Sequence, residues 1–164
     1  MSDLQAIADR VEIEALRGEF TDAAMTNDHD RLASLFTHDG AVRIPDGNIE
    51  ATGWEEIRAM SQRRQALADY FVQTTHSGAI RIDGDTATGR AYLSELIHGR
   101  DDSSHLNYLA YHDRYRRTSD GWKFTERIAE FRYLNTRAPA GPAPCPAEAP
   151  GGPPAGNKAA AEGP

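Results

Sequence analysis

The hydrophobic pattern of this 164-residue chain changes its period once, at about residue 70. Before this point apolar residues recur every three to four positions, which is the spacing of an amphipathic helix. After it the chain consists of long strand-like runs separated by turns rich in Asp, Gly and Ser. Helices followed by an antiparallel meander are typical of the α+β class. We therefore expect three N-terminal helices packed on one face of a curved, mostly antiparallel sheet.

Turn and capping signals divide the chain into its expected elements. Asn27-Asp28 can cap a short second helix, and Asp83-Gly84-Asp85 has the composition of a hairpin turn. The expected helices are residues 4–24, a short segment carrying Leu32, Leu35 and Phe36, and residues 52–67, with a turn at 37–40 and a short strand at 41–44. The expected strands that follow are residues 70–76, 79–82, 86–99, 105–117 and 122–134.

The last 27 residues have a different composition from the rest. Ala, Pro and Gly fill 22 of the 27 positions from 138 to 164, with no aromatic or branched aliphatic residue among them. Such a segment cannot bury enough apolar surface to offset its conformational entropy. We therefore predict a domain over residues 1–137 and a disordered tail over residues 138–164. The only cysteine, Cys145, lies in this tail and has no base near it in sequence.

Composition and motifs exclude several classes of protein. The net charge of −7 argues against a nucleic-acid partner, and no apolar run approaches the roughly 20 residues that span a bilayer. The acidic N-terminus carries no signal peptide, so we expect a cytoplasmic protein. No glycine-rich phosphate loop or GxSxG motif occurs, so nucleotide chemistry and serine hydrolysis have no support, and we expect no cofactor. The four strand histidines lack ligand spacing, so we expect no metal; they are His76, His98, His105 and His112.

Three segments point to a known family. They are residues 27–42, the helix start Gly53-Trp54-Glu55, and the closing run 120–124, which reads Asp-Gly-Trp-Lys-Phe. Together with the order of elements over residues 4–135, they resemble the SnoaL-like group of the nuclear transport factor 2-like superfamily. The resemblance implies a cone-shaped α+β barrel that encloses one apolar pocket, and a homodimer. Its members include dehydratases, dehydrochlorinases, epoxide hydrolases and polyketide cyclases, besides non-enzymatic proteins.

The resemblance also implies catalytic residues. His76 matches the family's catalytic histidine and Arg127 the arginine that assists the leaving group, but Met25 stands where an aspartate normally orients the histidine. Asp22, one helical turn before Met25, is our candidate for that role. Two strand carboxylates, Glu95 and Glu130, could point inward and are left as alternatives.

The candidate substrate contacts are aromatic and amide side chains. The strand 105–113 carries Asn107 and Tyr111 on one face, where they could hold a substrate oxygen or instead pack at a dimer interface. Strict alternation puts Arg127 on the face of Phe131 and Tyr133, without telling which face lines a pocket. The full set of expected substrate contacts is Phe20, Met25, Tyr70, Asn107, Tyr111 and Phe131.

These observations lead to two hypotheses. The first is a cofactor-independent cyclase, isomerase or dehydratase that acts on an apolar, oxygenated small molecule in bacterial, polyketide-like biosynthesis. Because Met25 replaces the orienting aspartate, cyclisation or isomerisation is favoured over elimination. The second is a non-catalytic module that binds a small molecule or dimerises.

Overall fold

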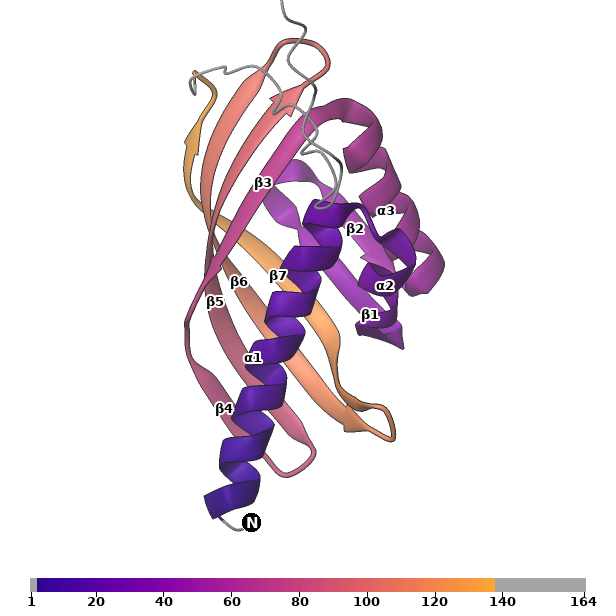
Figure 1. The fold of residues 1–164 in the computed structure, drawn as a ribbon, viewed down its shortest axis with the longest axis vertical. Coiled ribbons are helices and arrows are strands. Elements are labelled where there is room, and N and C mark those ends of the chain that lie inside the picture. Colours follow the sequence, from indigo (N-terminus) through magenta and orange to yellow (C-terminus); the bar gives the residue numbers. More distant parts are fainter. Residues whose placement is uncertain (1–2, 138–164) are drawn as a thin grey trace, which may run out of the picture.

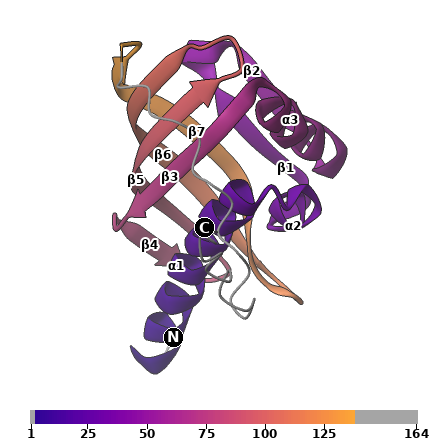
Figure 2. The ribbon, with the colours of Figure 1, turned by 45° about the horizontal axis from the view of Figure 1, so that its top comes forward.

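The computed structural model describes residues 3–137, so the predicted tail and Cys145 lie outside the described residues. Three α-helices and a short 3-10 turn cover one side of a seven-stranded sheet (Figures 1 and 2). The helical elements are α1 (Asp3–Thr26), α2 (His29–Ser34), η1 (Pro45–Gly47) and α3 (Trp54–Leu67). The strands are β1 (Phe36–Ile44), β2 (Ile49–Thr52), β3 (Ala68–His76), β4 (Ile80–Asp83), β5 (Thr86–Gly99), β6 (Ser104–Thr118) and β7 (Gly121–Asn135).

The sheet is curved and mixed. Its strand order is β2-β1-β7-β6-β5-β3, with β4 pairing on β5, and only the β1–β7 pair is parallel among the described strands. The sheet does not close, because β2 and β3 end the path without pairing with each other. The helices lie against its concave side, so the expected α+β cone is confirmed (Figure 2).

The region predicted as a turn at residues 37–40 belongs to β1 instead. The register between β1 and β7 shifts between Phe36 and Ala41, so these residues form an irregular stretch within the strand. A Cβ atom on Gly40 would lie only 3.1 Å from the carbonyl oxygen of Phe124, which explains the glycine at this crossing. Strand β2 was not predicted, because the run of four residues is short and three of the four are exposed.

A single core joins α1 to the sheet. Phe20 packs edge-on against Phe36, Phe124 and Tyr111, with ring centroids 5.9–6.1 Å apart. This aromatic cluster fixes the middle of α1 over the centre of the concave face. Within residues 3–137, none of the helices has the length and apolar character needed to cross a membrane.

Candidate active site

A cavity of about 870 Å³ lies between the concave face of the sheet and the helices. Most of its wall is apolar, with contributions from α1, α2, α3 and six strands; typical lining residues are Phe20, Leu32, Met60, Val42, Leu109 and Phe131. The exposed Ile49 and Leu67 also line it, so the cavity reaches solvent between β2 and the end of α3. Its size suits a ligand of one or a few rings.

Three polar side chains form a row across the cavity wall, which we call the polar row: Gln73, Glu95 and Asn107. They are cross-strand neighbours on β3, β5 and β6, because Glu95 is in register with Gln73 on one side and with Asn107 on the other. All three are buried and all three line the cavity. The amide of Gln73 donates to Glu95 Oε1 at 2.7 Å.

The carboxyl group of Glu95 has an altered acidity. Burial raises its pKa, and this effect outweighs the hydrogen bonds from Gln73 and Asn107 and the charge of Arg64, which lower it. A buried carboxyl group with a raised pKa can accept and return a proton nearer neutral pH than an exposed one. Glu95 is therefore the side chain of the polar row that is best suited to proton transfer.

Helix α1 holds the polar row from one end. Thr21 Oγ1 donates to Gln73 Oε1 at 3.1 Å and lies in short contact with the hydroxyl of Thr75. The backbone N–H of Gln73 points at the sulfur of Met25 at 2.9 Å. Met25 occupies the place where the resemblance puts an orienting aspartate, so the residue of β3 that contacts this place is Gln73, through its backbone N–H, and not His76.

Tyr111 lies deeper in the same cavity, above a buried ion pair. Arg127 Nε and Nη2 donate to the two carboxylate oxygens of Asp113 at 2.8 and 2.9 Å. The guanidinium carbon lies 4.1 Å from the ring centroid of Tyr111 and 4.4 Å from that of Phe20. Burial raises the pKa of Tyr111, so its hydroxyl stays protonated at neutral pH. Arg127 is not among the cavity-lining residues and lies behind these two rings.

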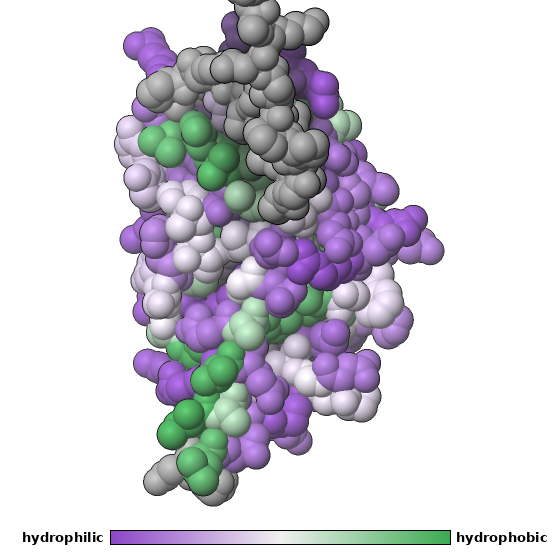
Figure 3. All heavy atoms as spheres, in the orientation of Figure 1, coloured by the Kyte–Doolittle hydropathy of each residue, from purple (hydrophilic) through white to green (hydrophobic). Residues whose placement is uncertain are grey.

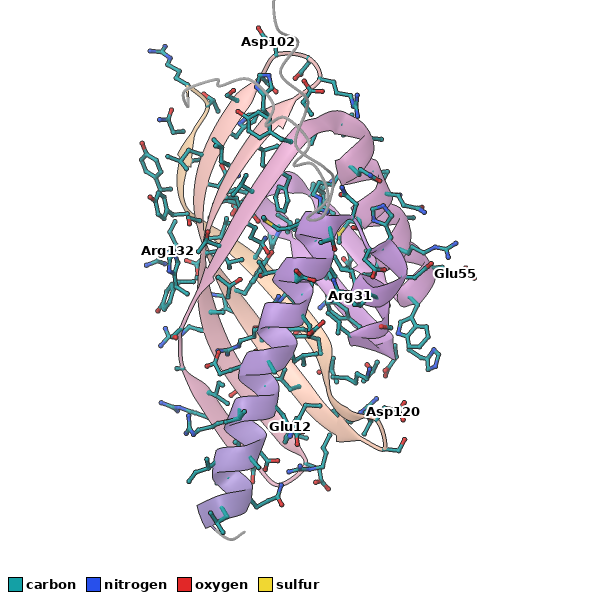
Figure 4. The ribbon with its side chains drawn as sticks, in the orientation of Figure 1. Glu12, Arg31, Glu55, Asp102, Asp120 and Arg132 are labelled. Carbon is teal, nitrogen blue, oxygen red and sulfur yellow. The ribbon has the colours of Figure 1, made fainter. Side chains whose placement is uncertain are left out.

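The three residues expected to be catalytic lie in three different environments. His76 is exposed at the end of β3, opposite Tyr92, and does not line the cavity. Asp22 is exposed on α1, where it forms an ion pair with Arg31, which Figure 4 shows near α1. Arg127 is buried beside Asp113. The structure therefore does not bring His76, Asp22 and Arg127 together.

The expected substrate contacts divide between two cavities. The main cavity is lined by four of them: Phe20, Asn107, Tyr111 and Phe131. A smaller cavity beside it is lined by the other two, Met25 and Tyr70. A register shift in β7 separates Phe131 from Tyr133, contrary to strict alternation. Phe131 faces the cavity, whereas Tyr133 is 52% exposed and packs on Tyr108.

The histidines do not form a metal site in the described part of the chain. Among residues 3–137 no three His, Cys, Asp or Glu side chains are grouped as metal ligands. His98 instead hydrogen-bonds Ser104 at 2.9 Å, and His112 pairs with Glu130 at 2.6 Å.

Sequence reasoning missed Gln73 and Arg64, and kept Glu95 only as an alternative. Alternation along β3 was the available signal, because Phe71, Gln73 and Thr75 share one face whereas His76 has the opposite parity. The structure shows that face packed inward, with Gln73 buried and His76 exposed.

The chain matches a known domain family over most of its described length. A family model, the SnoaL-like domain, covers residues 5–128. The chain belongs to this SnoaL-like family. The expected resemblance is thereby confirmed.

Individual relatives agree with this assignment. An uncharacterised Mycobacterium tuberculosis protein is 27% identical over 135 residues, which cover 78% of this chain and 88% of that relative. A structure assigned as an aromatic ring hydroxylase of Novosphingobium aromaticivorans is 27% identical, with a TM-score of 0.74 over 79% of this chain and 93% of that one. A hexachlorocyclohexane dehydrochlorinase of Novosphingobium barchaimii is 20% identical, with a TM-score of 0.79 over 88% of this chain and its full length, and this likeness concerns the fold.

Proposed function

We propose that this protein is a cofactor-independent enzyme of the isomerase, cyclase or dehydratase type. Its substrate would be an apolar, oxygenated small molecule, such as a polyketide-like ketone of bacterial biosynthesis. The observation that carries the proposal is Glu95, a buried carboxyl group in the wall of a mostly apolar cavity, hydrogen-bonded to Gln73. The dehydrochlorinase with the same fold supports proton abstraction as the reaction type.

The proposed reaction is a proton transfer within the cavity. The Glu95 carboxylate removes a proton from the carbon next to a substrate carbonyl, and the C–H electron pair moves into an enolate. The protonated hydroxyl of Tyr111 donates a hydrogen bond to the enolate oxygen. Glu95 then returns the proton to another carbon of the conjugated enolate. Alternatively, the enolate carbon attacks a second carbonyl to close a ring, or expels a β-hydroxyl group, and Glu95 gives its proton to the new alkoxide or to the departing hydroxide, which leaves as water. Arg127 acts through Tyr111 as a positioning residue, because its charge 4.1 Å from the ring makes the hydroxyl a better donor.

The proposal assigns the base role to Glu95 instead of His76, and one exchange experiment tests that choice. The protein is incubated with 1-tetralone in D₂O, and loss of the proton signal next to the carbonyl is followed by NMR. We expect Glu95→Gln to slow enzyme-dependent exchange by about 10²–10⁴-fold. His76→Ala is the control and should keep full activity. Unchanged exchange by Glu95→Gln, or its loss in His76→Ala, contradicts the assignment.

A second candidate function is ligand binding without catalysis. It is favoured by the contact between Met25 and Gln73, at the place where the resemblance implies an orienting aspartate, because neither of these side chains can transfer a proton near neutral pH. In that case the natural protein binds 1-tetralone but gives no exchange above the buffer rate.

Assembly and location complete the proposal. Tyr92, Tyr108 and Tyr133 are 44–52% exposed on β5, β6 and β7, and such aromatic side chains are common in the interfaces of homodimers. We propose a homodimer through these tyrosines, which light scattering of the protein and a Tyr108→Glu variant would test. A cytoplasmic location is part of the same proposal, supported by the single cysteine, which allows no disulfide within the chain.

A further inference from the structure

A second cavity of about 280 Å³ adjoins the main one. It lies where the end of α1, the end of α3 and the start of β3 meet. Its wall is largely polar and includes Asn27, Arg64, Gln65, Asp69, Tyr70 and Arg100. The two cavities share one wall, because four residues line both of them: Arg64, Ala68, Phe71 and Arg100.

Arg64 carries a charge without a counter-ion in this wall. Its side chain is partly buried, with the guanidinium carbon 4.3 Å from the ring centroid of Phe71. Nη2 donates to the carbonyl oxygen of Ala24 at 2.7 Å, whereas Nε is buried without a hydrogen-bond partner. No carboxylate of residues 3–137 lies within 4.0 Å of its nitrogens.

The other enclosed arginines differ from Arg64 in this respect. Arg127 is paired with Asp113, Arg17 with Glu14, and Arg117 with Asp9. Burial of a charge is costly unless an opposite charge or a full set of hydrogen bonds compensates it. Burial accordingly lowers the pKa of Arg64, and only the longer-range influence of Tyr111 and Glu95 raises it. An anionic group in the small cavity would supply the missing partner.

The surroundings restrict the kind of anion. Arg100 adds a second cation, but its own partner Asp69 lies 3.8 Å away and also lines the small cavity. Asp69 repels negative charge, so a singly charged group fits better than a doubly charged phosphate. A carboxylate also matches the planar donor geometry of a guanidinium.

We propose that Arg64 binds the carboxylate of an amphipathic ligand whose apolar body fills the main cavity. The placement of the ligand's apolar body in the main cavity rests on the proposed function. The carboxylate site does not, because it rests on Arg64 and the small cavity alone. The substrate class of the proposed function thereby narrows to ketones that also carry a carboxylate on an apolar body.

Calorimetry with two matched probes tests this site in the full chain. The probes are 2-naphthylacetate and its neutral amide, 2-naphthylacetamide. We expect the natural protein to bind the acid at least tenfold more tightly than the amide. Arg64→Gln should abolish the preference, whereas Arg64→Lys, which keeps the charge but loses the planar donors, should retain part of it. Arg58→Gln is the matched control and should change the preference less than threefold, because that arginine lies on the same helix, pairs with Asp30 and lines neither cavity.

The outcomes separate this site from the proposed catalysis. Glu95→Gln should keep the preference for the acid even where it stops proton exchange, so failure of the proposed reaction leaves this test intact. Equal affinity for acid and amide, absence of binding by both probes, or a full preference in Arg64→Gln overturns the proposal. If Arg64→Gln does not fold, as judged by circular dichroism, the acid-to-amide ratios of the natural protein and of Arg64→Lys decide.

Discussion

At the scale of single residues, the inside of the cone contains two kinds of charged group. Asp113 and Arg127 compensate each other, and Tyr115 donates to the same carboxylate at 2.6 Å. Glu95 has hydrogen-bond partners but no ion pair among the described residues. An uncompensated buried carboxylate costs stability, and such strain is common where side chains carry function.

Glu95 is therefore expected to make stability depend on pH. Because its pKa is raised above the ordinary value of 4.5, the native state binds more protons than the unfolded state between the two pKa values. The destabilisation of the native state by ionised Glu95 is absent below about pH 4.5 and grows as pH rises through the native pKa. Glu95→Gln should thus raise the free energy of unfolding by about 1 kcal/mol at pH 8 and leave it unchanged at pH 4. Urea unfolding at both pH values measures this, and a destabilised variant at pH 8 would contradict it.

Gly89 is a second residue whose identity is fixed by its surroundings. A Cβ atom there would lie 2.4 Å from Arg17 Nη2 and 2.6 Å from the carbonyl oxygen of Ala79. Since Arg17 donates to that carbonyl at 3.1 Å, Gly89→Ala would disturb a partly buried contact between α1 and the loop before β4. We expect a loss of about 2 kcal/mol in the free energy of unfolding, measured by urea denaturation. A loss below 0.5 kcal/mol would show that Arg17 can move aside.

At the scale of elements, α1 has two apolar faces. Ile13, Leu16 and Phe20 are buried against the sheet. On the opposite side Leu4, Ile7 and Val11 are 58–79% exposed, and they form the apolar stripe along the lower part of α1 in Figure 3. The helix is therefore held by its inner face, and its outer face contributes mainly through helix propensity.

This view predicts the effect of a substitution at Gly18. An added Cβ would meet nothing within 4 Å, and the residue lies inside the helix. Gly18→Ala should therefore stabilise the protein by about 0.8 kcal/mol, because alanine loses less backbone entropy in a helix. Thermal unfolding followed by circular dichroism measures the gain. A decrease in melting temperature would indicate that Gly18 has a role beyond the helix.

The elements also show what the sequence can and cannot predict. The bounds of β5 were predicted as observed, and those of β6 within one residue, because long alternating runs are closed by clear turns. Strict alternation fails in β7, where register shifts follow Tyr108 and Arg114 of its partner strand. Bulges depend on contacts with neighbouring strands, so a single strand does not reveal them.

The residues of the candidate site also include some that the sequence could predict and some that it could not. Asn107 and Tyr111 were found because they share one face of a regular strand, and both line the cavity. Alternation along β3 could have placed Gln73 on the inner face, but its partner Glu95 lies on another strand. Arg64 could not be selected, because its surroundings depend on Phe71 of another element. Only the packing of three elements shows that Arg64 lacks a counter-ion.

At the scale of the whole molecule, one buried carboxylate ties the first turns of α1 to the far end of the sheet. Asp9 accepts hydrogen bonds from Arg117 at 2.6 and 2.7 Å and from the indole of Trp122 at 3.2 Å. These partners belong to β6 and β7, more than 100 residues away in sequence. Asp9 therefore closes the narrow part of the fold by joining its first element to its last two strands.

The same contacts make Asp9 a source of acid sensitivity. The hydrogen bonds from Arg117 hold the pKa of Asp9 well below its ordinary value of 3.8, so the native state binds fewer protons than the unfolded state. The stabilisation is complete above about pH 3.8 and is lost as pH falls toward the native pKa. Asp9→Asn should lower the free energy of unfolding by about 3 kcal/mol at pH 7, because it leaves Arg117 without its buried partner.

The difference in the free energy of unfolding between Asp9→Asn and the natural protein should then become smaller below pH 3.8. Urea unfolding between pH 3 and pH 7 measures this difference. Glu12→Gln is the matched control, because Glu12 is exposed on the same helix and should change stability by less than 0.5 kcal/mol (Figure 4). If the two free energies of unfolding differ by the same amount at every pH, Asp9 stabilises the fold through packing and not through its charge. Because Asp9 lies outside the cavity wall, Asp9→Asn should leave the acid-to-amide ratio of the naphthyl probes unchanged wherever the protein stays folded.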